Sequence, residues 1–179
     1  MLRLLLLLLC STPTLAADYV AQQPSQLGFT AEFQGEAFEG RFARFTPAIR
    51  FDPDDLAGSR FDVRIELASA DTDNEERDEL LLGGDFFAVG DQPDARYVAT
   101  RFKSLGNGRY VAEGELSLRG VTKAVPLTFS WTPGSPTVLE GEATLDRLAF
   151  KVGVGDWSDT GLLPASVKVT TRLLLMPRK

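Results

Sequence analysis

The sequence predicts an all-β domain, a closed barrel or a sandwich of about eight antiparallel strands with one short helix. Two observations predict this fold class. Apolar residues recur with a period of two over most of the chain, which is typical of strands that bury one face. Turn-forming sequences lie between these runs, so consecutive strands are joined by short loops and must be antiparallel.

The alternating runs mark the clearest strands. In residues 27–33, large apolar side chains alternate with polar residues or glycine. The same alternation recurs in four later runs, at residues 61–67, 110–118, 125–131 and 167–173. Each run therefore offers one face to a core and one face to water.

Four short sequences rich in glycine, proline, asparagine and aspartate separate the runs, and these residue types favour turns. They are residues 51–55 (Phe-Asp-Pro-Asp-Asp), 106–108 (Gly-Asn-Gly), 119–120 (Arg-Gly) and 132–136 (Thr-Pro-Gly-Ser-Pro). Their positions predict a meander of neighbouring strands.

One interval, residues 71–82, breaks the alternation and predicts a short helix. Thr72 followed by Glu75 is typical of a capping box, and Gly83-Gly84 ends the segment. Its acidic residues are favourable near the positive end of the helix dipole. They do not fit a calcium loop, because Glu76 occupies the position of the required glycine and Leu82 that of the bidentate glutamate.

Closure of the sheet would remove the exposed edges that favour aggregation. The interior of an eight-stranded barrel is either filled by side chains or wide enough for one small ligand. Eleven of the aromatic residues lie on or beside the apolar faces of the predicted strands, where they could pack on one another or line a tunnel. The periodicity leaves both alternatives open.

Residues 1–16 are predicted to be a cleaved signal peptide. Arg3 precedes a leucine run, and Thr14-Leu15-Ala16 supplies small residues for a peptidase. An alternative retains Cys10 as an acylated residue, but Leu9 is not the small residue that such processing requires before the cysteine. We therefore expect export, cleavage near Ala16 and a periplasmic domain over residues 17–179.

The expected mature chain contains neither cysteine nor histidine, because Cys10 is the only cysteine and the sequence has no histidine. This excludes disulfides, imidazole catalysis and histidine-ligated zinc, so we expect no metal and no cofactor. With Arg3 removed, 18 basic residues face 25 acidic residues, a net charge of about −7 that disfavours nucleic acid.

Motif stretches lie in order along almost the whole predicted mature chain: residues 25–29 with 39–42, 49–53, 71–78 running to 85–87, 114–123, 145–150 and 155–160. The most specific are Asn74-Glu75-Glu76-Arg77-Asp78 and Arg119-Gly120-Val121-Thr122-Lys123. Together these stretches resemble the YceI-like family of periplasmic lipid-binding proteins. Turn and helix chemistry alone would also explain these two motifs.

The resemblance implies an extended eight-stranded antiparallel barrel of lipocalin-like shape. It implies a long apolar pore that holds a polyisoprenoid or a quinone tail, carriage of that lipid in the periplasm, and no enzymatic turnover. Longer tails are expected to bind more tightly, since each buried methylene contributes about 0.8 kcal/mol. Strand parity selects six candidate contacts in the pore: Phe29, Phe33, Phe42, Phe102, Phe129 and Trp131.

Two features refine the resemblance. Many members have a histidine late in the first strand, where this chain has Gln34, so any head-group contact made there falls to an amide or is absent. Residues 153–157 are most similar to a subgroup found beside or fused to b-type cytochromes, which favours a quinone tail and transient contact with such a cytochrome.

Two further functions remain open on the residues alone. A filled barrel would act as a protein-interaction or stress-protective module near a membrane cytochrome. A carboxylate-based hydrolase would need two acidic side chains facing one cleft, and the spacing of the acidic residues does not indicate such a pair.

Overall fold

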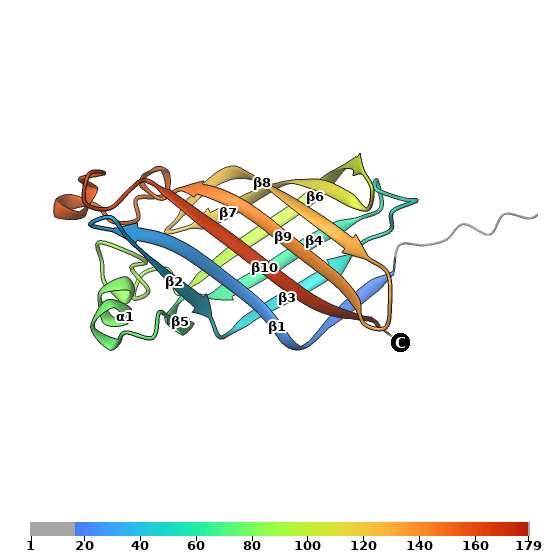
Figure 1. Cartoon of the computed structure of the whole chain (residues 1–179), viewed down its shortest axis with the longest axis horizontal. Coiled ribbons are helices and arrows are strands. Elements are labelled where there is room, and N and C mark those ends of the chain that lie inside the picture. Colours follow the sequence, from blue (N-terminus) through green and yellow to red (C-terminus); the bar gives the residue numbers. More distant parts are fainter. Residues whose placement is uncertain (1–16, 179) are drawn as a thin grey trace, which may run out of the picture.

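The protein, as a computed structural model that describes residues 17–178, is a single sheet of ten antiparallel strands rolled into a barrel (Figure 1). The predicted signal peptide lies outside the described residues. The strands are β1 (Asp18–Phe33), β2 (Glu36–Phe42), β3 (Phe45–Arg50), β4 (Arg60–Glu66), β5 (Ala70–Asp71), β6 (Asp94–Gly106), β7 (Arg109–Leu118), β8 (Val121–Thr132), β9 (Thr137–Asp146) and β10 (Ser166–Pro177).

The ten strands occupy eight positions around the barrel. β2 pairs with the second half of β1 and β3 with its first three residues, so β2 and β3 together flank one edge of β1. In the same way, β5 pairs with β2 while β4 pairs with β3. β1 also pairs with β10, which closes the sheet and confirms the predicted eight-stranded antiparallel barrel.

The predicted turns join the strands as expected. Asn107 and Gly108 between β6 and β7, and Arg119 and Gly120 between β7 and β8, have positive φ angles of 53°, 70°, 51° and 71°. Positive φ at both central residues matches the right-handed twist of the strands they connect. These tight hairpins fix the register, so that one face of each strand points into the barrel.

The one α-helix of residues 17–178, α1 (Glu75–Leu82), lies within the predicted segment, but its cap differs from the prediction. The Asn74 side chain, not that of Thr72, accepts a hydrogen bond from the Arg77 amide. Thr72 instead donates its hydroxyl to Asp78 at 2.6 Å, so it organises the turn before the helix. Gly83 ends the helix, as predicted.

The two ends of the barrel differ (Figure 1). At one end lie α1, the β1–β2 turn and the long β9–β10 connection, which contains the 3-10 helices η2 (Leu148–Phe150) and η3 (Gly155–Ser158). At the other end lie the C-terminus and the β6–β7 hairpin. Within residues 17–178, no helix is long and apolar enough to cross a membrane.

Candidate functional site: an apolar cavity in half of the barrel

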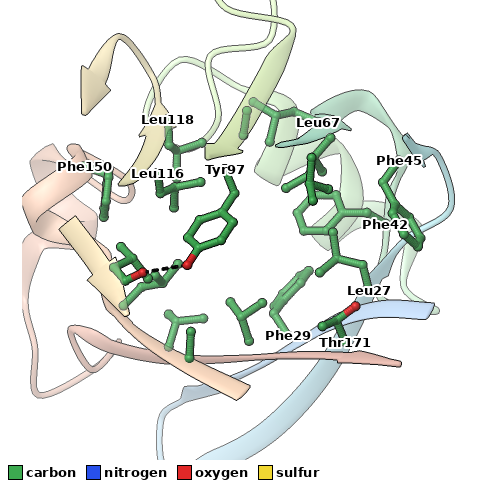
Figure 2. A pocket seen from close by; sticks show the side chains of 18 of the residues that line it. Leu27, Phe29, Phe42, Phe45, Leu67, Tyr97, Leu116, Leu118, Phe150 and Thr171 are labelled. Carbon is green, nitrogen blue, oxygen red and sulfur yellow. Dashed lines mark hydrogen bonds between the residues drawn. The ribbon is translucent and has the colours of Figure 1, made fainter. Parts of the chain in front are cut away.

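A cavity of about 200 Å³ lies inside the barrel and reaches to the end that carries α1 (Figure 2). Its walls are the inward faces of strands all around the barrel. Four of these strands illustrate the wall. They contribute Leu27 and Phe29 of β1, Phe61, Val63 and Ile65 of β4, Leu139, Ala143 and Leu145 of β9, and Val167, Val169 and Leu173 of β10.

The alternation of β10 shows why the walls are apolar. Val167 and Val169 line the cavity, while Lys168 and Arg172 face water and form ion pairs with Glu142 and Glu140 of β9. Successive side chains of a strand point to opposite faces, so charge on the outside and hydrocarbon on the inside follow from the same sequence pattern.

At the α1 end, the cavity is covered by a cap made of two loops. Leu81, Phe86 and Phe87 come from α1 and the segment after it, and Phe150, Val152 and Leu163 come from the β9–β10 connection. All six side chains are buried. We refer to residues 81–93 and 147–165 together as the cap.

Arg147 organises the longer cap loop from within. Its guanidinium is buried and donates five hydrogen bonds to main-chain carbonyls, at Val152, Gly153, Trp157, Leu163 and Pro164. Burial lowers the pKa of Arg147, and no carboxylate in residues 17–178 forms an ion pair with it. Five carbonyl partners use all five N–H donors of the side chain.

Arg119 ties the two cap loops together. From the β7–β8 turn, its guanidinium donates to the carbonyls of Gly84 and Asp85 in one loop and of Lys151 in the other. The amide of Gly153 also donates to the Asp85 carbonyl, at 2.7 Å. The Arg-Gly motif at this hairpin therefore has a structural role besides making a tight turn.

The second specific motif supports the cavity wall from outside. The Arg77 guanidinium lies 4.4 Å from the centre of the Phe38 ring, a cation–π contact, and donates to the main-chain and side-chain oxygens of Thr72. Asp78 accepts hydrogen bonds from the amide and the hydroxyl of the same threonine. Phe38 lines the cavity, so this network holds one wall residue in place.

Among the residues that the structure describes, only three with polar side-chain atoms line the cavity: Tyr97, Arg147 and Thr171. The Tyr97 hydroxyl lies 3.1 Å from the Val125 carbonyl, and Thr171 donates to the Gln26 carbonyl at 2.9 Å. Burial raises the pKa of Tyr97, which therefore stays neutral. Every polar side chain of the wall is thus already engaged with main-chain carbonyls.

The other half of the barrel is filled by six buried aromatic rings, which we call the aromatic plug: Phe51, Phe61, Phe102, Tyr110, Phe129 and Trp131. Phe51 is at its centre, with ring centroids 4.8 to 6.0 Å from those of the other five. Contacts of this kind stabilise a core beyond the area they bury. Of these six rings, Phe61 also lines the cavity, and the other five do not.

The six predicted contact residues fall into three groups. Phe29 and Phe42 line the cavity, with ring centroids 5.6 Å apart. Phe102, Phe129 and Trp131 lie in the aromatic plug and not in the cavity wall. Phe33 lies at the outer end of β1, is 36% exposed and packs against Trp157.

Strand parity explains this outcome. It predicts which side chains of a strand share a face, but it carries no information on their level along the barrel axis. The candidates therefore divide between the cavity, the plug and the rim. That Phe29 and Phe42 contact a ligand stays a prediction.

The sequence reasoning missed the aliphatic part of the wall and most of the cap. Leu116 and Leu118 of β7 face Leu27 and Phe42 across the cavity in Figure 2. The alternation of apolar and polar residues predicts that both leucines point inward, but it does not predict whether an inward side chain lines a cavity or packs in a filled core. Phe86 and Phe87 stand in one of the family motifs, which was the available signal for the cap.

A closed antiparallel barrel with an apolar cavity under a loop cap defines the class of lipocalin-like barrels. The chain belongs to a particular family within it: residues 19–174 match the YceI-like domain. Among curated relatives, a UPF0312 protein of Photorhabdus laumondii is 37% identical over 125 residues, and one of Vibrio parahaemolyticus is 33% identical over 116.

These matches cover 68% and 63% of this chain and 65% and 61% of the two relatives, so the aligned part spans slightly less than two thirds of their length. A UPF0312 protein of Pseudomonas savastanoi is 33% identical, with 86% of each chain covered. The family membership therefore rests on most of the barrel.

Two solved structures share the fold. BcnA of Burkholderia cenocepacia superposes with a TM-score of 0.83 at 25% identity, covering 88% of this chain and 99% of that one. A polyisoprenoid-binding domain from Saccharophagus degradans has a TM-score of 0.68 at 16% identity, covering 92% of this chain and all of that one.

Proposed function

We propose that this protein binds an isoprenoid lipid, a polyprenol or a quinone, by enclosing its tail in the apolar cavity, and that it carries the lipid through the periplasm. The observation that carries the proposal is the lining of the cavity. Its walls are hydrocarbon, and the three polar side chains that reach it donate hydrogen bonds to main-chain carbonyls.

A ligand in such a site must need no hydrogen bonds along its buried part. An unpaired polar group in an apolar interior loses several kcal/mol, whereas each buried methylene contributes about 0.8 kcal/mol. A branched hydrocarbon tail meets both conditions. The name of the Saccharophagus domain as polyisoprenoid-binding supports an isoprenoid as that tail.

The periplasmic part of the proposal depends on the signal peptide predicted at residues 1–16. A carrier that shields a lipid tail from water serves the space between two membranes. Intact-mass measurement of the protein from the periplasmic fraction is expected to give a chain beginning at Ala17. A chain that retains residues 1–16, or an acylated Cys10, would contradict this part.

The binding proposal is tested by organic extraction of natively purified protein, followed by mass spectrometry. We expect a prenyl lipid from the wild type. Ala143→Phe, which places a ring into the cavity, is the matched control and is expected to yield none. Repeated absence of any prenyl lipid, together with no uptake of added quinone, would contradict the proposal.

The alternative of a wholly filled barrel accords less well with the structure, because only the plug half is filled. We therefore propose binding and carriage without turnover, and keep contact with a membrane b-type cytochrome as a part of the proposal that rests on residues 153–157 alone.

A further inference from the structure

An exposed apolar patch lies at the rim of the barrel, where the β1–β2 turn meets the β9–β10 connection (Figure 1). Phe33, the last residue of β1, is 36% exposed, and Leu162 of the β9–β10 connection is 45% exposed. The ring centroid of Phe33 lies 6.1 Å from that of Trp157, and the amide of Gln34 donates to the Leu162 carbonyl at 2.8 Å. We call Phe33, Trp157 and Leu162 the rim patch. These three side chains do not line the cavity, so binding of a tail inside the barrel does not account for their exposure.

The rim patch is connected to the cavity by aromatic rings. Trp157 of η3 is half-buried, and besides Phe33 its ring contacts that of Phe86 in the cap, with the centroids 5.3 Å apart. Phe86 is buried and lines the cavity. The contacts therefore lead from the exposed ring of Phe33 through Trp157 to the cavity wall. A hydrocarbon tail that follows them stays against apolar side chains between the surface and the cavity.

The position and the residue types of the rim patch favour a lipid bilayer as the surface that it contacts. Single exposed apolar residues are ordinary, but a cluster of them with a polar surround is typical of an interaction site. Tryptophan is enriched where membranes meet water, because its ring is apolar and its N–H is polar. The lipid of the proposed function dissolves in bilayers, so the surface next to its cavity must approach one.

The charge around the rim patch indicates which bilayer it fits. The two segments that form the patch, residues 32–36 and 155–162, carry four acidic side chains and no basic one: Glu32, Glu36, Asp156 and Asp159. All four acidic residues are exposed. Anionic lipids give a membrane a negative surface potential, which attracts basic segments and repels acidic ones. The rim therefore fits a surface of zwitterionic lipids better than an anionic one.

Resting on the proposed function, we propose that the rim patch docks the barrel on zwitterionic lipid bilayers and that the lipid tail passes between bilayer and cavity beside Trp157. Phe33 and Leu162 enter the membrane interface on contact. With only three apolar side chains and an acidic surround, the contact is transient, which suits a carrier that must also leave the membrane.

Two measurements of uptake separate docking from binding. In the first, phosphatidylcholine vesicles that contain a two-unit ubiquinone are mixed with the full-length mature chain, the protein is separated at timed intervals, and its quinone is quantified by mass spectrometry. This gives the rate of uptake from a membrane. In the second, the same quinone is added from ethanol without vesicles, which gives the amount that the cavity binds when no membrane is involved.

A matched pair of variants tests the rim patch. Leu162→Asp is expected to lower the rate of uptake from vesicles at least about fivefold and to leave uptake without vesicles unchanged, because a charge disfavours insertion into the interface. Leu105→Asp makes the same change at a leucine that is 54% exposed, at the β6–β7 hairpin of the opposite end, and should change neither (Figure 1). Equal rates for the two variants, or a loss by Leu162→Asp from both sources, would overturn the docking while leaving the proposed function intact. No uptake by the wild type from either source would overturn both.

The lipid composition of the vesicles tests the preference for zwitterionic lipids. When about a third of the phosphatidylcholine is replaced by phosphatidylglycerol at low salt, we expect the wild type to take up quinone at least about threefold more slowly. Raising the salt to about 0.5 M should remove most of this difference, because salt screens the repulsion between exposed charges. Equal or faster uptake from the anionic vesicles at low salt would overturn the preference.

Discussion

The two halves of this barrel are built from the same long strands but have opposite interiors. Around the cavity, the inward residues are leucine, valine, isoleucine and alanine together with nine aromatic rings, and space remains between them. In the plug, five rings meet around Phe51. The comparison teaches that a single alternating pattern can produce both a cavity and a packed core, depending on whether the inward rings converge on one another, as they do around Phe51.

The difference also separates stability from function. The plug is a conventional core whose loss should unfold the protein, whereas the cavity leaves part of its lining without contacts on one side. The cap closes the cavity with loops and two arginines instead of strands. Four predictions break or sharpen this comparison, and they follow from the largest expected effect to the smallest.

Phe51→Ala removes the centre of the plug and is expected to lower the free energy of unfolding by about 4 kcal/mol. Phe42→Ala makes the same truncation in the cavity wall, where one side of the ring already lacks partners, and should lower it by about 2 kcal/mol. Urea unfolding measures both. Equal losses would mean that the two halves are packed alike.

Arg147→Met keeps the unbranched stem of the side chain but removes the guanidinium with its five donors, which leaves buried carbonyls without partners. We expect a loss of about 3 kcal/mol in the free energy of unfolding, with faster hydrogen exchange confined to residues 147–165. Arg172→Met, which breaks an exposed ion pair with Glu140, is the control and should change stability by less than about 1 kcal/mol. Unchanged exchange in the cap would contradict the role of Arg147.

Ala143→Phe sharpens the comparison because it adds an aromatic ring to the cavity wall and so partly fills the cavity. Its ring should occupy open space, so the free energy of unfolding should change by less than about 1.5 kcal/mol while lipid uptake falls at least about tenfold. Thr144→Phe, one position along β9 on the exposed outer face, should leave uptake unchanged. Normal uptake by Ala143→Phe would show that the ligand lies elsewhere.

Asp62 of β4 lies on the outer surface of the barrel, where it forms ion pairs with Arg60 and Arg96. Hydrogen bonds from Arg96, and then from Arg60, lower its pKa to about 2. Because the folded pKa lies below the unfolded value, the carboxylate stabilises the fold above about pH 4 and this contribution is lost as the pH falls towards 2. The gain is at most about 1 kcal/mol at such an accessible site.

Asp62→Asn should therefore reduce the loss of stability between pH 4 and 2 and leave lipid uptake at neutral pH unaltered. Thermal unfolding across that range measures the first effect. An unchanged acid profile would mean that Asp62 contributes nothing through this pKa shift.

The sequence predicted most of the fold. Alternation located the strands, and the turns at 106–108, 119–120 and 132–136 located the hairpins, because both signals are local in the chain. The helix was predicted, but its cap was assigned to Thr72 and not to Asn74. Thr72 and Asn74 are both residue types that cap helices well, and they lie two positions apart. The hydroxyl of Thr72 donates to Asp78 and accepts from Arg77, so it does not cap the helix.

The site was less accessible to sequence reasoning. Phe29 and Phe129 look alike in the sequence, since both are inward aromatics of long strands, yet one lines the cavity and the other fills the plug. Their difference arises from the level at which the tilted strands bring them to the axis, which depends on register across the whole barrel. Arg147 stabilises the cap by donating hydrogen bonds to main-chain carbonyls. Every residue has such a carbonyl, so the sequence does not show which ones the arginine binds.

The central claim is that an isoprenoid tail occupies the apolar cavity between the strands and the cap. A crystal structure of the mature chain loaded with a three-unit ubiquinone tests it most directly. We predict continuous electron density for the tail inside the barrel, beside Phe29 and Phe42. A tail bound on the outer surface, with no density beside Phe29 and Phe42, would contradict the account.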